Sequence, residues 1–565
     1  PAPGADAFAG HVTVVEAGDP TPPVVDTDLP TNERATLRST MRTDRLTAVD
    51  ATVGAVLDAA PSGTTVLVVD VDGTPGTRPA LGTTLVRPSS DGPDQSRYLT
   101  SAATRTDGVA RVLDVPATVL DAAGAATPAR IQDTPLAWGS PRPADATSTA
   151  DALADLTTRD HVRRAVYTAF VDVPLYAGLV IAGLCLLLAP RAARATGDRA
   201  RARWARAAHW ARGAALVVAA APTAAFLVSL TGWWRFGNQT LAIVVSTVLA
   251  TAAVAGLGAL APRRPVWLGP GIVAGITFAV LTLDALVGTP LNRASPLGSA
   301  PTFGARFYGF GNPTFSVYAV AALVVAAALA QWLVARGHRY AAAATVGVIG
   351  LVTMVVDVWP TLGADLGGGL VVVPAFAVLG LAASGARVTW RRFLLVATAG
   401  VALVAAVGVL DWLRPADERS HLGRFVGQVV DGSAWETLLR KAGYAARSVL
   451  GGVPVWLTIA VLVAAALLLF WPRRFTPRWF ARTEAAWPLV RPTLLALWIV
   501  AVAGSLVNDF GVRIALIALI PAVPLLTVAA LHAADDADGT AEGEGEDPDE
   551  RTGAGSASRV ESATS

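Results

Sequence analysis

Residues 313–335 read PTFSVYAVAALVVAAALAQWLVA, an apolar run without a charged side chain. A helix rises about 1.5 Å per residue, so this run extends about 35 Å and can cross a hydrocarbon core of about 30 Å. Ten further runs of similar character lie at residues 171–190, 213–234, 239–261, 268–289, 340–359, 367–385, 393–411, 453–471, 492–508 and 511–532. The sequence therefore predicts a polytopic α-helical membrane protein with about 11 transmembrane helices.

The composition agrees with a membrane location. Hydrophobic residues make up 53% of the 565 residues and charged residues 16%, which is more apolar surface than one soluble core would bury. Of the 45 basic residues Lys441 is the only lysine, which leaves 44 arginines, a bias typical of high-GC bacterial genomes. The only cysteine, Cys185, lies in an apolar run, which excludes a disulfide framework and a thiolate metal site.

The distribution of arginine predicts how the chain crosses the membrane. Alternate short loops contain nineteen arginines, at 191–212, 262–267, 336–340, 386–392 and 472–491. Arginine-rich loops face the cytoplasm, so the opposite segments 1–170, 290–312 and 412–452 are predicted to be extracytoplasmic in a multi-pass protein of the cell (plasma) membrane. The basic loop 191–212 is interpreted as a topology determinant that touches anionic lipid, and no nucleic-acid partner is predicted.

Four segments follow from this topology. Residues 1–138 are predicted to form an extracytoplasmic α/β domain, because a helix-like stretch at 46–60 precedes the strand-like run TTVLVVDV at 64–71. Residues 139–170 are a linker and pre-membrane segment, and 171–532 are the transmembrane domain. The acidic, Gly/Ser-rich residues 533–565 predict a disordered cytoplasmic tail. Because the chain begins at Pro1 without a signal peptide, an upstream segment is expected.

Ionisable residues in the apolar runs gather toward one membrane face. Burying a carboxylate in a spanning helix is costly, so such groups usually face a polar cavity or a partner. Five aspartates are predicted near the outer face, namely Asp284, Asp357, Asp365, Asp411 and Asp509. The outer segments add Arg235, Asn238, Arg306, Tyr308, Asn312, His421, Arg424, Asn508 and Arg513. Snorkelling to water or capping of helix ends is the structural alternative for each of them.

These residue types suit an anionic, lipid-linked substrate. Arginines and backbone N–H groups beside glycines bind phosphate, whereas carboxylates move protons or hold a divalent cation. We expect catalytic roles for Asp365, Asp509 and His421. Substrate-binding roles are expected for Arg306, Tyr308, Asn312, Arg424 and Asn508. No residue is assigned to a metal and no cofactor is identified.

Three functions are compatible with this pattern. The first is an envelope protein that handles a lipid-linked or phosphate-bearing precursor at the outer leaflet, with membrane lipid as a further partner. The second is a transporter or lipid flippase, in which Asp284, Asp357 and Asp509 are coupling sites and 363–369 is a broken-helix loop. The third is a non-catalytic membrane scaffold. Without Walker, HExxH, GxSxG or CxxC motifs, a nucleotide-driven machine is not predicted.

Part of the N-terminal domain resembles the C-terminal part of alkaline-phosphatase-like domains. The likeness rests on residues 46–57 (LTAVDATVGAVL), 64–73 (TTVLVVDVDG) and 104–124, with Asp114 at the acidic position of the last segment. Where that superfamily has Ser-Asp-His-Gly, this chain has Asp-Val-Asp-Gly at 70–73, so only Asp72 could replace a metal ligand. The nucleophile half of the fold is absent, and the resemblance implies a truncated or degenerate domain without phosphatase activity.

The membrane half resembles a family of uncharacterised actinobacterial polytopic integral membrane proteins. The motifs that carry the resemblance are GARFYGFGN at 304–312, GADLGGG at 363–369, DWLRPADERSHLGRF at 411–425 and NDFG at 508–511. The resemblance implies relatives with the same order of parts and implies no reaction.

Overall fold

Helices make up most of the structure, a computed structural model. It describes residues 12–18, 31–71, 81–89, 96–126, 128, 131, 134–194, 197–299, 301, 307–386, 389–414, 421–432 and 434–543. The chain divides into two units. One comprises Pro1–Ala165 with Ser299–Tyr308, and the other comprises Val166–Gly298 with Gly309–Ser565.

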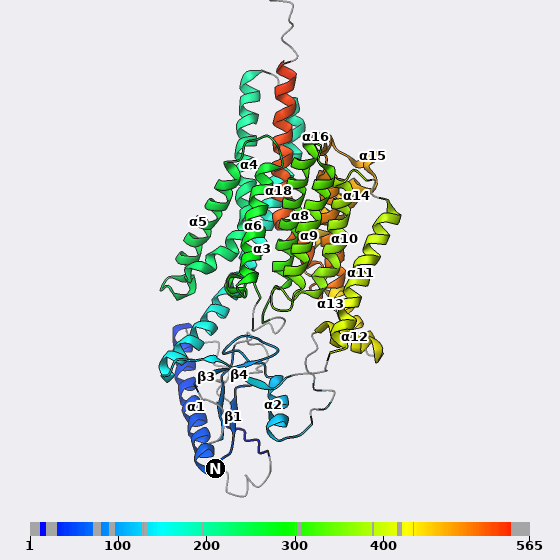
Figure 1. The fold of residues 1–565 in the computed structure, drawn as a ribbon. Coiled ribbons are helices and arrows are strands. Elements are labelled where there is room, and N and C mark those ends of the chain that lie inside the picture. Colours follow the sequence, from blue (N-terminus) through cyan, green and yellow to red (C-terminus); the bar gives the residue numbers. More distant parts are fainter. Residues whose placement is uncertain are drawn as a thin grey trace, which may run out of the picture. The chain divides into compact units, whose positions relative to one another are not determined.

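The first unit combines helices with two small antiparallel sheets (Figure 1). Helix α1 (Thr31–Ala59) precedes strand β1 (Val66–Val69), which pairs with β2 (Thr84–Arg87). Strand β3 (Arg97–Ser101) pairs with β4 (Leu136–Pro141), and α2 (Asp114–Ala122) lies between them in sequence. The predicted helix and strand at 46–60 and 64–71 therefore fall on α1 and β1, although α1 begins fifteen residues earlier than expected.

Helix α3 (Ala146–Ala193) joins the predicted linker to the first apolar run without a break. Asp145 caps its first turn, because the Ser148 N–H donates to Oδ1 of Asp145 at 2.7 Å. Hydrogen bonds from the backbone and side chain of Ser148 lower the pKa of Asp145. Further along the helix, Arg163 and Asp160 form a buried ion pair at 3.0 Å.

Each predicted apolar run falls on a long helix. Nine helices within the described residues are long and apolar enough to cross a membrane, as a polytopic helical membrane protein requires. These are α3, α4 (Asp198–Leu227), α5 (Gln239–Ala259), α6 (Leu268–Leu286), α8 (Asn312–Ala335), α9 (Arg339–Val358), α14 (Val453–Phe470), α17 (Val490–Val507) and α18 (Arg513–Gly543). The other two runs coincide with α10 (Leu366–Ala383) and α11 (Trp390–Trp412), whose passage through the membrane stays a prediction.

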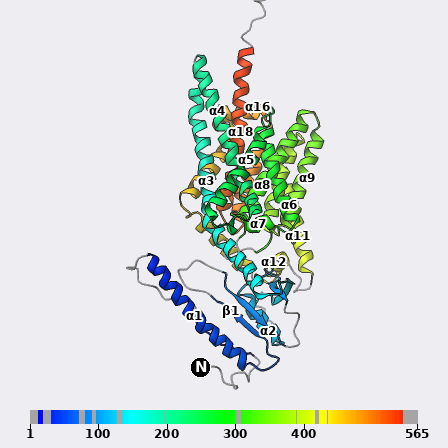
Figure 2. The same cartoon turned by 90° about the vertical axis from the view of Figure 1, so that its left-hand side faces the viewer.

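Helix α8 is the central helix of the second unit. Its most apolar stretch is 72% buried, against 28% in α5 and 17% in α14. Helices α6, α9 and α18 pack around α8 (Figures 1 and 2). Helix α17 contacts α8 as well. Small residues permit close approach, since an added methyl group at Gly271 of α6 would press against Ala328 of α8. The core therefore consists mainly of alanine, valine and leucine.

Short helices fill the connections between the long ones. They are η2 (Val228–Thr231), η3 (Trp233–Arg235), α7 (Pro290–Ala294), α12 (His421–Val430), α13 (Ala434–Ser448), α15 (Pro472–Phe475) and α16 (Arg478–Ala486). At the C-terminal end α18 continues past residue 532 to Gly543. The helix includes residues 533–543 of the predicted tail. Residues 544–565, the rest of that segment, lie outside the described residues, and the disordered cytoplasmic tail stays a prediction.

Candidate functional site

Five of the predicted polar residues lie near the start of α8 and the end of α9. The α9–α10 connection folds back on the start of α8, because the Phe310 N–H donates to the Gly363 carbonyl at 2.7 Å. Likewise Asn312 donates through Nδ2 to Oδ1 of Asp509, which follows α17, at 3.1 Å. We use the name polar cluster for Asn312, Asp357, Asp365, Asn508 and Asp509 throughout.

The connection between α9 and α10 is tightly folded. The Gly363 N–H donates to the Val356 carbonyl at 2.7 Å, and the Asp365 N–H donates to the Asp357 carbonyl at 2.7 Å. Gly309 has φ +67° and packs so closely on Gly363 that a Cβ atom there would overlap the Gly363 carbonyl. A left-handed backbone and close contact both favour glycine. The glycines of the two motifs therefore fix how the helix ends meet.

Two buried carboxylates lie at the first turn of α10. Asp357 and Asp365 are 0% and 2% exposed, and Asp365 is the residue that precedes the helix. The Asp357 side chain reaches α10, since a methyl group at Gly368 would overlap its carboxylate and the Phe315 ring. The positive end of a helix dipole stabilises negative charge there. Part of the cost of burying these carboxylates is thereby offset.

Asn508 brings a carboxamide to the same turn of α10. Its side chain is 6% exposed and touches the backbone of Gly367, where a methyl group would overlap Oδ1. Its Nδ2 donor is buried and has no acceptor among the described residues. Buried donors are nearly always hydrogen-bonded, so the Asn508 amide is a donor that a bound acceptor could satisfy.

Asn312 and Asp509 form the exposed side of the polar cluster. Asp509 is exposed and Asn312 is half-buried, whereas Asp357, Asp365 and Asn508 are buried. The polar groups therefore run from the surface into the apolar bundle. Carboxylates accept hydrogen bonds from hydroxyl groups and can take up protons, and the asparagine amides donate to phosphate or sugar oxygens. No group of three or more metal-binding His, Cys, Asp or Glu residues occurs among the described residues.

Asp284 lies outside the polar cluster, and its hydrogen bonds support the local fold. Its carboxylate accepts from the N–H groups of Leu291 and Asn292 at 2.7 and 3.0 Å, at the start of α7. Asn292 in turn donates to the Gly309 carbonyl at 2.6 Å and accepts from the Thr314 hydroxyl at 2.6 Å. Asp284 therefore holds α7, which in turn holds the segment that begins α8.

Sequence reasoning missed Asn292 and Thr314 as supporting residues. Both are buried polar residues; Thr314 is the second residue of the predicted apolar run 313–335, and Asn292 follows the run 268–289. A polar residue at the end of an apolar run is the signal that could have identified them. Their hydrogen bonds depend on closure of the loop between α6 and α8, which periodicity does not predict.

Other predicted residues lie elsewhere. Asp411 accepts from the Gly423 N–H at 2.8 Å and so anchors the first turn of α12. Tyr308 belongs to the first unit, where the Arg105 guanidinium lies 4.5 Å from the ring centroid. Asn238 caps α5 through the Leu241 N–H at 3.0 Å.

Four predicted arginine and histidine residues remain. Arg306 lies outside the described residues, as do the side chains of His421 and Arg424 on α12. Their roles stay predictions. Arg513, at the start of α18, lies 5.8 Å from the Phe510 ring centroid and is exposed.

Two aspartates in the segments that resemble alkaline-phosphatase-like domains form contacts within the first unit. Asp114 is fully buried and pairs with Arg111 at 2.7 Å, and the Asp70 N–H donates to the Thr83 carbonyl at 2.8 Å. Asp72 lies outside the described residues. The resemblance to alkaline-phosphatase-like domains and the membership in the actinobacterial family therefore stay hypotheses. Comparisons with protein-family models, with curated proteins and with solved structures find no match to this chain.

Proposed function

We propose that this chain is an integral membrane protein of the bacterial cell envelope that handles a lipid-linked, phosphate-bearing substrate at the outer leaflet. The polar cluster would bind the head group of that substrate. The apolar helices would leave its lipid chain in the bilayer, so the substrate would not have to leave the membrane.

The observation that carries the proposal is the buried amide of Asn508. A buried donor without an acceptor costs about 1–3 kcal/mol, and Nδ2 of Asn508 has none among the described residues. A bound phosphate or sugar oxygen would satisfy it. The nearby pair of Asn312 and Asp509 at 3.1 Å offers a polar route from the surface to this amide.

Each member of the polar cluster has a role in this proposal. Asn508 and Asn312 donate to oxygens of the head group, and Asp509 accepts from its hydroxyl groups or acts as a base. Asp365 lies deeper and is the second candidate base. Arg306 and Arg424 are proposed to hold the phosphate, and His421 to exchange protons with it.

A proton-coupled transporter or lipid flippase is the second candidate function. The full burial of Asp357 within α9 favours it, because buried carboxylates in spanning helices commonly serve as proton or ion sites. In that case Asp357→Asn should abolish pH-driven lipid movement in proteoliposomes. Under the first proposal the same variant should retain any lipid movement that the wild-type protein shows.

Mass spectrometry of cellular lipids tests the first proposal. A strain lacking the native gene would express one of four genes. These are the wild type, the two cluster variants Asn508→Leu and Asp365→Asn, and the control variant Thr345→Val. Thr345 is half-buried on α9, and its hydroxyl donates to the Ala341 carbonyl of its own helix.

At equal protein levels, both cluster variants should accumulate the same lipid-linked precursor, and the control should match wild type. Identical lipid profiles in all four strains would contradict the proposal.

A further inference from the structure

Helix α13 (AWETLLRKAGYAARS) is held at the ends of long helices, although it is too short and too polar to cross a membrane. Its last turn contacts the turn between α17 and α18, because the Val512 N–H donates to Oγ of Ser448 at 3.0 Å. A methyl group at Gly511 of that turn, where φ is +60°, would overlap the same hydroxyl. Helix α14 begins five residues after α13 ends. The last turn of α13 therefore lies at the level where α17 ends and where α14 and α18 begin.

Helix α12 ties the other end of α13 to the bundle. It packs against the end of α11 (Figures 1 and 2), where the Gly423 N–H donates to Oδ2 of Asp411 at 2.8 Å. Gly427 of the next turn lies close to the Trp412 indole. Helix α13 begins four residues after α12 ends, and its first residue, Ala434, is buried. The pair of α12 and α13 is therefore attached to the bundle at both ends.

Three sides of α13 have different surroundings. Ala445 and Ser448 face the turn between α17 and α18 through Gly511. On the third side from this contact, Tyr444 and Arg447 are exposed, and the Arg447 guanidinium lies 4.9 Å from the Tyr444 ring centroid. The remaining side, the apolar stripe of α13, is exposed and recurs at helical spacing in Trp435, Leu439, Ala442 and Ala446. A helix with one apolar and one polar exposed side suits the plane of a membrane interface.

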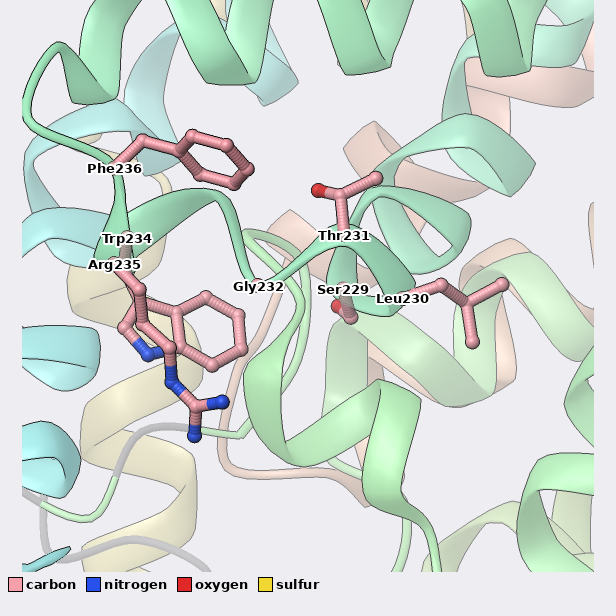
Figure 3. A pocket seen from close by; sticks show the side chains of 7 residues that line it. All are labelled: Ser229, Leu230, Thr231, Gly232, Trp234, Arg235 and Phe236. Carbon is pink, nitrogen blue, oxygen red and sulfur yellow. The ribbon is translucent and has the colours of Figure 1, made fainter.

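Aromatic side chains mark the level of the interface at this end of the bundle. Tyr340 near the start of α9 and Trp359 just after its end are both exposed, and they lie about 28 Å apart along the helix, close to the hydrocarbon thickness of about 30 Å. Trp456, in the first turn of α14, is also exposed. In the connection between α4 and α5, the Arg235 guanidinium lies 5.5 Å from the Trp234 ring centroid (Figure 3). Because tryptophan and tyrosine prefer the level of lipid head groups, the interface lies at the helix ends to which α13 is attached.

We propose that α13 lies flat in the head-group region of the leaflet at this end of the bundle, the predicted outer leaflet, and that lipid acyl chains cover its apolar stripe. Attachment at the level of the helix ends favours lipid over a soluble partner, because a helix at that level lies within the bilayer interface. Acyl chains cover the stripe, and head groups and water solvate Tyr444 and Arg447.

The contact of Ser448 with Gly511 brings this helix close to the polar cluster, since Gly511 follows Asn508 and Asp509 by two to three residues. Lipids beside α13 would therefore present their head groups at the level of the polar cluster. That consequence rests on the proposed function, whereas the membrane position of α13 does not.

Nitroxide labels on single cysteines test the position of α13. The full-length chain with Cys185→Ala would carry Leu439→Cys on the apolar stripe or Arg447→Cys on the polar side of the same helix, and would be reconstituted into phosphatidylcholine and phosphatidylglycerol liposomes. Ser62→Cys, at an exposed position of the first unit, gives the reference for a label in water. Collision rates with oxygen, which concentrates among acyl chains, and with a water-soluble nickel complex would be measured for each label.

The ratio of oxygen to nickel collisions should be several-fold higher at 439 than at 447, and the ratio at 447 should approach that at 62. Thermal unfolding of each labelled chain checks the fold, and Ala446→Cys repeats the test on the stripe if the label at 439 destabilises the protein. Nickel access at the stripe equal to that at 62 would place α13 in water. Shielding of the stripe from both reagents would mean that protein covers it. Either result would overturn the proposal, and neither depends on whether the polar cluster binds a substrate.

Discussion

The carboxamide of Asn508 differs in its surroundings from the other buried carboxamide described above, that of Asn292. Asn292 donates to the Gly309 carbonyl and accepts from the Thr314 hydroxyl, whereas Nδ2 of Asn508 has no acceptor among the described residues. Replacement by leucine, which has a similar volume, should therefore affect the two positions differently. Asn292→Leu should lower the free energy of unfolding by about 1–3 kcal/mol, because it leaves buried partners unsatisfied.

Asn508→Leu removes an unsatisfied donor and should leave the unfolding temperature unchanged or raise it. The same variant should lose substrate handling, as expected where a functional site lowers stability. Thermal unfolding in detergent compares the two variants directly. A loss of stability in Asn508→Leu as large as that in Asn292→Leu would mean that Asn508 is a structural residue.

At the scale of single residues, the sequence predicts which groups are unusual and does not predict their partners. Asp284 and Asp357 both lie in apolar runs, so each is a candidate from the sequence. The N–H groups that satisfy Asp284 come from a short helix after a loop, and Asp357 reaches a neighbouring long helix at Gly368. Only the folded connections distinguish a structural carboxylate from a member of the polar cluster.

The packing of α10 against α9 gives a prediction for a single element. Gly368→Ala would place a methyl group on the Asp357 carboxylate and the Phe315 ring, so α10 has to move. The free energy of unfolding should fall by about 1–3 kcal/mol, the usual cost of overpacking. Gly347→Ala on α9 is the matched control, because a methyl group there meets nothing within 4 Å. Thermal unfolding of both variants measures the difference, and equal unfolding temperatures would contradict the described contact.

The start of α3 gives a second prediction at this scale. Asp145→Ala removes the cap on the Ser148 N–H and should weaken the first turn, while Asp145→Asn should keep most of the cap. Because folding lowers the pKa of Asp145, the cap should be complete above the ordinary aspartate pKa of about 3.9 and be lost as the pH falls through the lowered value. Hydrogen exchange of residues 146–150 reports the effect. Equal exchange in Asp145→Ala and wild type would contradict it.

At the scale of elements, the length of an apolar run predicted a helix reliably. Each predicted apolar run falls on a helix because about 20 apolar residues can satisfy their backbone groups in lipid only that way. Elements without that constraint were harder to predict. The polar first half of α1 has no apolar periodicity, and the amphipathic helices α12 and α13 lie in the segment 412–452, which contains no predicted apolar run.

At the scale of the whole molecule, the composition of the first unit constrains the membrane topology. Residues 299–308 belong to the same unit as the N-terminal segment, and the Thr106 hydroxyl donates to the Phe307 carbonyl at 3.3 Å. Segments in one folded unit must lie on one side of the membrane. The distribution of arginine predicts the outer side of the membrane for both segments.

Cysteine labelling in intact cells checks this orientation. In a Cys185→Ala background, Ser62→Cys should react with a membrane-impermeant maleimide, and Ala202→Cys in the arginine-rich first part of α4 should react only after lysis. Both positions are exposed. The opposite pattern would invert the topology and place the polar cluster at the cytoplasmic face.

Photocrosslinking next to the polar cluster tests the central claim most directly. Benzoylphenylalanine would replace Phe510, which adjoins Asp509, or the control Phe470, which is exposed at the end of α14. After irradiation of living cells, mass spectrometry would identify the lipids attached to the protein. We predict a phosphate-bearing, lipid-linked head group at position 510 that is absent at 470. The same bulk membrane lipids at both positions would contradict a substrate site at the polar cluster.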